Sequence, residues 1–123
     1  MPGKPMDRDC WAKCTIVEQL GNIGSEVGRA IKAKRESMPD RMEGAINRAL
    51  DLFSATVEVL IRDKGNMQNH YRAREVLLAR DQFLSLFCGG DFQDADKVES
   101  YFMNFAYMAR MKHYAALGQS KAT

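Results

Sequence analysis

Apolar residues recur at helical spacing in four stretches of the chain. In residues 9–36 the stripe steps by four, three, four and four positions and consists of Ile16, Leu20, Ile23, Val27 and Ile31. A second stripe, in residues 39–63, consists of Met42, Ile46, Ala49, Leu50, Phe53, Val57 and Leu60. The third, in 68–88, consists of Ala73, Val76, Leu77, Phe83, Leu84 and Phe87. The fourth stretch begins after Asp91 or Asp94 and ends near Ala116. Its apolar stripe consists of Ala95, Val98, Phe102, Phe105, Ala106 and Ala109.

Turn-forming residues separate these stretches. The breaks fall at Ser37-Met38-Pro39-Asp40, Lys64-Gly65-Asn66 and Gly89-Gly90-Asp91, and no stretch sustains the alternation typical of a strand. Helices of similar length joined by short loops pack most simply up-down-up-down. The sequence therefore predicts an all-α antiparallel four-helix bundle, with a single domain over 9–117 and flexible tails at 1–8 and 118–123.

Two features of the predicted helices need an explanation. Gly21, Gly24 and Gly28 follow one flank of the first helix, where each costs about 1 kcal/mol relative to alanine. We expect the backbone of another helix to approach this flank closely, although a kink near Gly21 and Gly24 is the alternative. Arg80 interrupts the apolar stripe of the third helix, so its guanidinium must reach solvent or a carboxylate.

The last helix carries more apolar surface than one core requires. A second flank holds Met103, Tyr107, Met111 and Tyr114, and Trp11 adds to it if the first helix is regular at that point. Exposed clusters of Trp, Tyr and Met mark association surfaces. These five residues are the predicted interface of a homo-oligomer.

Composition and motifs favour a non-catalytic protein of the cytoplasm. Three cysteines without an apolar leader indicate reduced thiols, and no apolar run is long enough for a membrane span. Neither His70 nor His113 belongs to a Glu-x-x-His pair, and Cys10-x-x-x-Cys14 alone does not make a zinc site. We therefore expect no metal, no cofactor and no catalytic residue, although an enzyme using His113, Arg80 or Cys88 stays open.

Basic residues cluster at the predicted turn between the second and third helices. The group consists of Arg62, Lys64, His70, Arg72 and Arg74, with Tyr71 among them. Positive charge beside an aromatic ring is typical of nucleic-acid contacts, but a solvated helix end is the commoner meaning of such a group. The net charge of the chain is only +2. RNA or DNA binding is therefore the alternative to a protein-interaction role.

Two families of small helical proteins share features with this chain. Its length, helix number and Trp11-Ala12-Lys13 resemble the four-helix proteins of the 23S ribosomal RNA intervening-sequence group, which includes accessory proteins of diversity-generating retroelements. Asn22-Ile23-Gly24-Ser25-Glu26 is similar to an Asn-Ile-x-Glu-Gly motif of that group but lies closer to the tryptophan. The resemblance implies a basic, oligomeric helical bundle.

The chain is also similar in size to the HEPN family of helical ribonucleases and nucleotidyltransferase partners. The ribonucleases of that family use an Arg with a His five to seven positions later. Arg110-x-x-His113 is too short for this pattern, and no other arginine stands at that distance before a histidine. This second resemblance therefore implies a protein without nuclease activity. Taken together, these features predict a homo-oligomeric interaction or adaptor protein.

Overall fold

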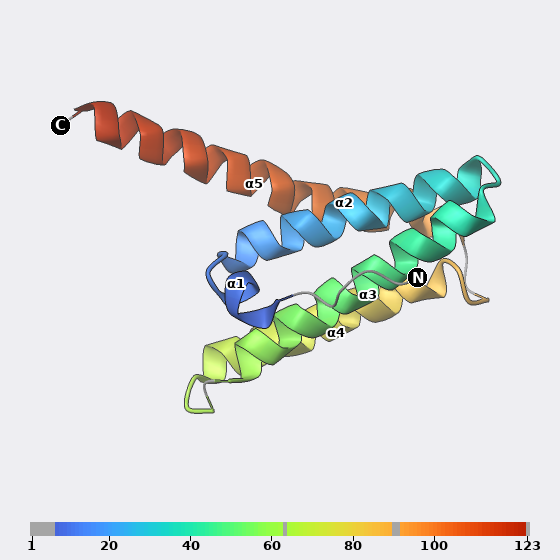
Figure 1. The fold of residues 1–123 in the computed structure, drawn as a ribbon, viewed down its shortest axis with the longest axis horizontal. Helices are drawn as coiled ribbons and strands as arrows, with labels where there is room; N and C mark the ends of the chain where they lie inside the picture. The colour runs from blue at the N-terminus through green and yellow to red at the C-terminus, as the bar shows by residue number, and fades with distance from the viewer. Residues whose placement is uncertain (1–6, 63, 90–91, 123) are drawn as a thin grey trace.

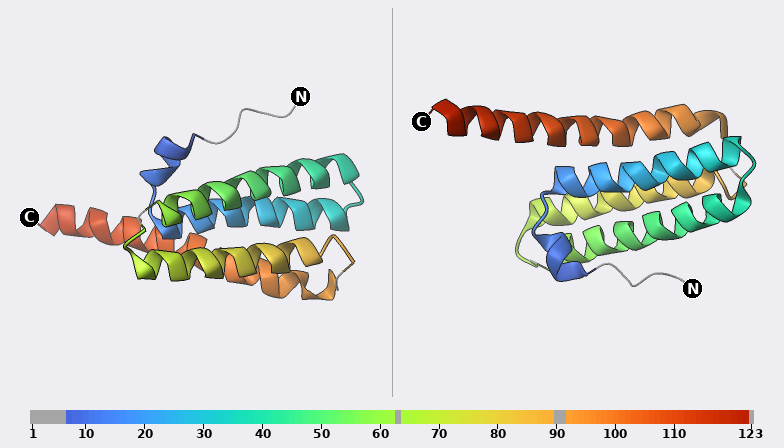
Figure 2. Two further views of the ribbon diagram at one scale, coloured as in Figure 1. Left: turned by 90° about the horizontal axis from the view of Figure 1, so that it is seen from below. Right: turned by 45° about the horizontal axis from the view of Figure 1, so that its top comes forward.

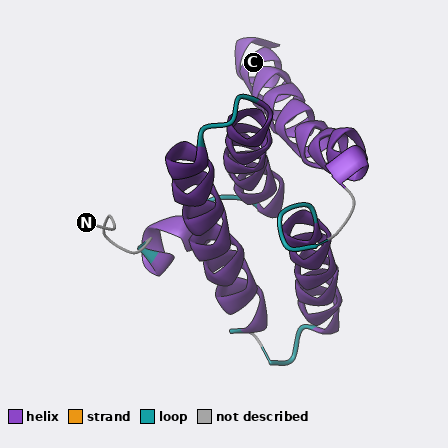
Figure 3. Ribbon diagram, turned by 90° about the vertical axis from the view of Figure 1, so that its right-hand side faces the viewer, coloured by secondary structure: helices purple, strands orange, loops and turns teal. Residues whose placement is uncertain are grey.

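In the computed structural model, all the regular secondary structure of the described part is helical. The structure describes residues 7–62, 64–89 and 92–122, with the backbone alone at 109, 110, 112–114 and 116–122. The elements are α1 (Arg8–Ala12), α2 (Ile16–Arg35), α3 (Pro39–Ile61), α4 (Met67–Ser85), the 3-10 turn η1 (Phe92–Asp94) and α5 (Ala95–Ala122). Over these residues no strand is present (Figure 3). The prediction of an all-α fold is confirmed.

The four long helices run alternately in opposite directions (Figures 1 and 2). Helix α2 packs extensively along both α3 and α5, and α3 packs along α4, whereas α4 and α5 share only a small contact. The short helix α1 lies against α3. Helix α2 is therefore the element that connects α5 to the rest of the molecule.

Aromatic and aliphatic side chains from all four long helices form one core. Phe53 of α3 contacts Phe83 of α4 and Phe102 of α5, with ring centroids 6.1 and 5.8 Å apart. Ile23 and Ile31 of α2 are fully buried among them. Several residues of the predicted α3 stripe are only half-buried, namely Met42, Ile46, Leu50 and Val57. The buried face of α3 is instead centred on Ala45, Ala49, Leu52, Phe53, Thr56 and Leu60, because this helix packs against α2 and α4 at once.

The glycine flank of α2 lies directly against α5. A Cβ atom placed on Gly24 would lie 2.8 Å from Cβ and 3.2 Å from the carbonyl oxygen of Phe102. One placed on Gly21 would lie 3.1 Å from Cα of Ala106, and one on Gly28 would meet only Oε1 of Glu99, at 3.5 Å. Helix backbones approach this closely only where side chains are absent. The expected close approach is confirmed, and its tightest point is Gly24.

The first predicted helix is divided into two, and this moves Trp11 into the core. Thr15 caps α2 by accepting a hydrogen bond from the Glu18 backbone N–H, while the Glu18 side chain accepts one from the Thr15 N–H. The chain turns before this capping box, so α1 leaves the axis of α2. Trp11 is only 4% exposed, and the expectation that it lies on an exposed interface is wrong.

Hydrogen bonds inside the core fix Trp11 in this position. Its indole Nε1 donates to Oγ1 of Thr56, which is fully buried, over 2.8 Å. The Gln19 side-chain amide donates to the carbonyl oxygens of Trp11 and Cys14, at 3.0 and 3.1 Å. These bonds satisfy polar groups that burial would otherwise leave without partners.

Helix α5 is longer than the sequence predicts. Its expected end before Gly118 is wrong, because the helix continues to Ala122. A single interior glycine costs only about 1 kcal/mol, and no proline follows to stop the helix. The neighbouring Ala115, Ala116, Leu117 and Gln119 are all good helix formers.

We expect Gly24→Ala to destabilise the fold by about 1–3 kcal/mol, because the added methyl group overpacks the contact with Phe102. Urea unfolding followed by circular dichroism measures this change. Gly28→Ala is the matched control, since alanine has space there and gains about 1 kcal/mol of helix propensity. Equal free energies of unfolding for the two variants would contradict the close contact at Gly24.

We expect Thr56→Val to lower the free energy of unfolding by about 1–3 kcal/mol, because the buried indole N–H of Trp11 loses its acceptor while the side-chain shape is kept. Ser54→Ala, an exposed hydroxyl removed from the same helix, is the control and should change little. The same urea titration compares the two. A Thr56→Val protein as stable as the parent would show that this hydrogen bond contributes nothing.

Candidate functional surfaces

Helix α5 carries an exposed apolar surface along its described length. Met103, Tyr107, Met108 and Met111 are each between 44% and 58% exposed. Met103, Tyr107 and Met111 were predicted from the sequence, and their spacing of four residues puts them on one row of the helix. Met108 was missed, because it lies beside this row rather than in it. The predicted interface residue Tyr114 has a side chain outside the described part of the chain.

This row lies away from the contact with α2. Phe102 and Ala106 are the α5 residues that meet the glycines of α2. Each residue of a helix turns the chain by about 100°, so Met103 and Tyr107 are carried away from that contact. Apolar residues consequently occupy both the inner and the outer faces of α5. A second apolar face on a helix is commonly covered by another surface.

The register of α2 against α5 shows where their contact ends. Gly28 lies near Glu99, Gly24 near Phe102 and Gly21 near Ala106, so the two helices are antiparallel. Continued at the same rise, this register brings Ile16, the first residue of α2, level with Met111. Residues 112–122 of α5 therefore extend past α2 by about 16 Å. Figure 1 shows this end of α5 projecting from the other helices.

The predicted basic patch lies at one end of the molecule and faces solvent. Arg62 follows α3, Lys64 lies in the turn, and His70, Tyr71, Arg72 and Arg74 belong to the first two turns of α4. All six residues are exposed. Met67, Tyr71 and Leu78 also form an exposed apolar row on α4, a feature that the sequence analysis missed. Their steps of four and seven residues carry the signal for one helix face.

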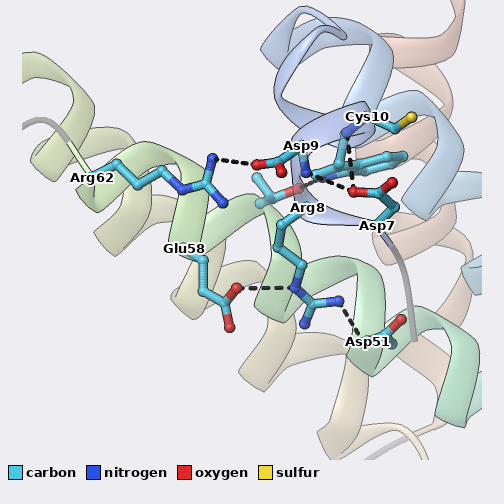
Figure 4. Close-up of polar contacts among 9 residues, drawn as sticks. Asp7, Arg8, Asp9, Cys10, Asp51, Glu58 and Arg62 are labelled. Atoms are coloured by element: carbon cyan, nitrogen blue, oxygen red, sulfur yellow. Dashed lines mark hydrogen bonds and ion pairs between the residues drawn. The ribbon is translucent and has the colours of Figure 1, made fainter.

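Part of the positive charge in this region is used to hold α1 (Figure 4). Arg62 Nη1 lies 3.6 Å from a carboxylate oxygen of Asp9. Arg8 is bound at 2.9 Å by Glu58 and at 3.1 Å by Asp51, two carboxylates of α3. The hydrogen bond to Glu58 is the main cause of a raised Arg8 pKa, and the bond to Asp51 adds to it. Arg62 is therefore partly neutralised, whereas Arg72 and Arg74 form no ion pair within the described residues.

Arg80 lies in the apolar stripe of α4, and its side chain extends toward solvent. The residue is half-buried, and Nη2 lies 3.4 Å from a carboxylate oxygen of the neighbouring Asp81. Its Nε is buried without a hydrogen-bond partner among the described residues. The stem thus packs among apolar side chains while the end of the guanidinium stays hydrated.

Two open pockets on the surface have polar linings. One lies between α2 and α3 and is lined by Arg29, Lys32, Ala33, Glu36, Asp40, Arg41, Gly44 and Arg48. The other lies between α4 and α5 and is lined by Gln82, Ser85, Asp94, Lys97, Val98 and Tyr101. Burial, with a smaller contribution from the charge of Glu75, raises the pKa of Tyr101.

The residues considered for catalysis or metal binding form no metal-binding cluster within the part of the chain whose side chains are described. Cys10 and Cys88 are exposed and Cys14 is half-buried, all three as free thiols. Within the described part of the chain, no group of three or more His, Cys, Asp and Glu residues has the geometry to hold a metal ion. His70 is exposed on α4, and the side chain of His113 lies outside the described residues.

Comparisons with models of protein families, with curated proteins and with solved structures gave no significant match. None of the helices, over the residues described, combines the length and the apolar character needed to cross a lipid bilayer.

Proposed function

We propose that the protein is a non-catalytic interaction or adaptor protein of the cytoplasm, assembled as a homo-oligomer and built on an antiparallel up-down-up-down four-helix bundle of α2 to α5. The observation that carries this proposal is the exposed apolar surface of α5, with Met103, Tyr107 and Met111 in one row. Side chains of this kind in water cost free energy that association recovers, at about 25 cal/mol per Å² of apolar area.

The length of α5 supports the same proposal. A helix of 28 residues spans about 42 Å, and α2 accompanies it only as far as Met111. Isolated helical segments of about 11 residues are marginal in water, so packing against another surface is the usual source of their stability. An adaptor needs no cleft with reactive groups, and the polar pockets between the helices are compatible with that role.

The test of assembly is the molar mass of the protein in solution. We expect multi-angle light scattering to give a multiple of the 13.9 kDa chain mass at micromolar concentration. In Tyr107→Glu/Met111→Glu, carboxylates replace half-exposed apolar side chains, and the dissociation constant should rise by more than about 100-fold. Circular dichroism confirms that the variant keeps its helices.

Leu78→Glu is the matched control, because Leu78 is also an exposed apolar residue but belongs to α4. This variant should keep the parent's molar mass. A parent protein that stays monomeric at high concentration would refute assembly. If Leu78→Glu dissociated the oligomer and the α5 variant kept the parent's molar mass, the interface would lie on α4 instead.

Nucleic-acid binding is the second candidate function, favoured by the exposure of all six residues of the basic patch. Arg72 and Arg74 can approach phosphates while Tyr71, 65% exposed, offers a ring on which a base can stack. A partner bound in this way is an RNA or DNA whose bases are accessible for stacking.

We expect Arg72→Glu/Arg74→Glu to weaken binding of labelled single-stranded RNA or DNA, measured by fluorescence anisotropy at several salt concentrations. The slope of log affinity against log salt should fall by about two if both arginines contact phosphates. Lys32→Glu/Arg41→Glu reverses the same number of charges in the α2–α3 pocket and is the control. Equal losses in both variants, or no binding at low salt, would eliminate this function.

A further inference from the structure

Helix α5 is polarised in charge along its length. From η1 to the second turn of α5 there are three carboxylates, Asp94, Asp96 and Glu99, and one lysine, Lys97. After Glu99 the chain has no acidic residue, and it contains Arg110, Lys112 and Lys121. The exposed apolar row occupies the middle, between these two regions. The helix thus begins acidic, continues apolar and ends basic.

The apolar row is symmetric about Tyr107. Met103 precedes it by four residues and Met111 follows it by four, and all three side chains are about half exposed. If two such rows meet in antiparallel orientation with Tyr107 at the centre, each Met103 faces a Met111 of the other copy. A two-fold axis brings the same patch of both chains together, so that a residue at the axis faces its own copy.

We infer that α5 pairs antiparallel with α5 of a second copy of this chain, about a two-fold axis beside Tyr107. This arrangement places Asp94, Asp96 and Glu99 of one α5 along the basic end of the other, which gives an attraction at both ends. Arg35 of α2 pairs with Asp96 and Glu99 and lowers the net negative charge there, so this attraction is weak. A parallel pair would place like charges side by side at both ends. The charges therefore favour the antiparallel orientation, while the row of Met and Tyr supplies the buried area.

The projecting end of α5 fits the same arrangement. With the axis beside Tyr107, residues 112–122 of one copy lie level with the first turns of α5 in the other copy. Those first turns belong to the body of the molecule, because Arg35 of α2 binds Asp96 at 2.7 Å and Glu99 at 3.9 Å. The segment that extends past α2 thus gains a neighbouring helix from the second copy. The inference rests on the proposed homo-oligomer and identifies its interface.

Disulfide crosslinking tests both the residue at the axis and the orientation. Cys10, Cys14 and Cys88 are not buried and are first replaced by serine. In this background Tyr107→Cys should oxidise to a covalent dimer about 100-fold faster than Leu78→Cys, because the paired thiols face each other at an effective concentration near millimolar rather than at bulk micromolar concentration. Leu78→Cys places an equally exposed thiol on α4.

Two further variants determine the orientation. Met103→Cys and Met111→Cys should each crosslink slowly alone and quickly when mixed, giving a heterodimer that mass spectrometry identifies. Rapid crosslinking of Met103→Cys with itself would establish a parallel pair and overturn the inference. The parent and the cysteine variants are also analysed by light scattering. An oligomer without any of these crosslinks refutes the α5 pair and leaves the proposed function standing, whereas a monomeric parent refutes both.

Discussion

The close contact between the glycines of α2 and the backbone of α5 determines the shape of the molecule. Helix α5 has only a small contact with α4, so its position depends on α2. At Gly24 the space available is less than a methyl group requires, and the tight approach brings Phe102 into the aromatic centre with Phe53. The same contact fixes the register of α5, and the register in turn leaves the last residues of the helix beyond the end of α2.

A second set of interactions anchors the connection between α4 and α5 to α2. The Lys34 ammonium group donates to the carbonyl oxygen of Leu86 at 3.0 Å and lies 4.5 Å from the ring centre of Phe92. Arg35 binds Asp96 in the first turn of α5. Basic residues at the end of α2 thus hold the start of α5. Their position is also favourable because the C-terminal end of a helix carries partial negative charge. Lys34 and Arg35 therefore have a structural role.

Much of the fold was predictable because it depends on local periodicity. The stripe from Leu20 to Ile31 and the glycine flank beside it were both visible in the sequence, and both have the expected environment. The division between α1 and α2 was also encoded, in the Thr15-x-x-Glu18 capping box, but the apolar spacing on either side concealed it. The hydrogen bond from Trp11 to Thr56 joins residues far apart in the chain, and no local pattern indicates such a partner.

The candidate surfaces were predictable to a smaller extent. Exposure of Met103, Tyr107 and Met111 follows from helix geometry once the inner face of α5 is known. The role of Arg62 in holding α1 required the three-dimensional position of Asp9, and the partial solvation of Arg80 required the surroundings of its side chain. Neither can be derived from spacing, because each depends on which helices become neighbours.

The burial of Trp11 gives the molecule a natural optical reporter. It is the only tryptophan in the chain, and its indole is enclosed at the junction of α1 with α3. Its emission wavelength therefore responds to water reaching this junction, whereas the far-ultraviolet ellipticity reports on all the helices. Detachment of the five-residue α1 can in this way be distinguished from melting of the whole fold in the unmodified protein, without an introduced label.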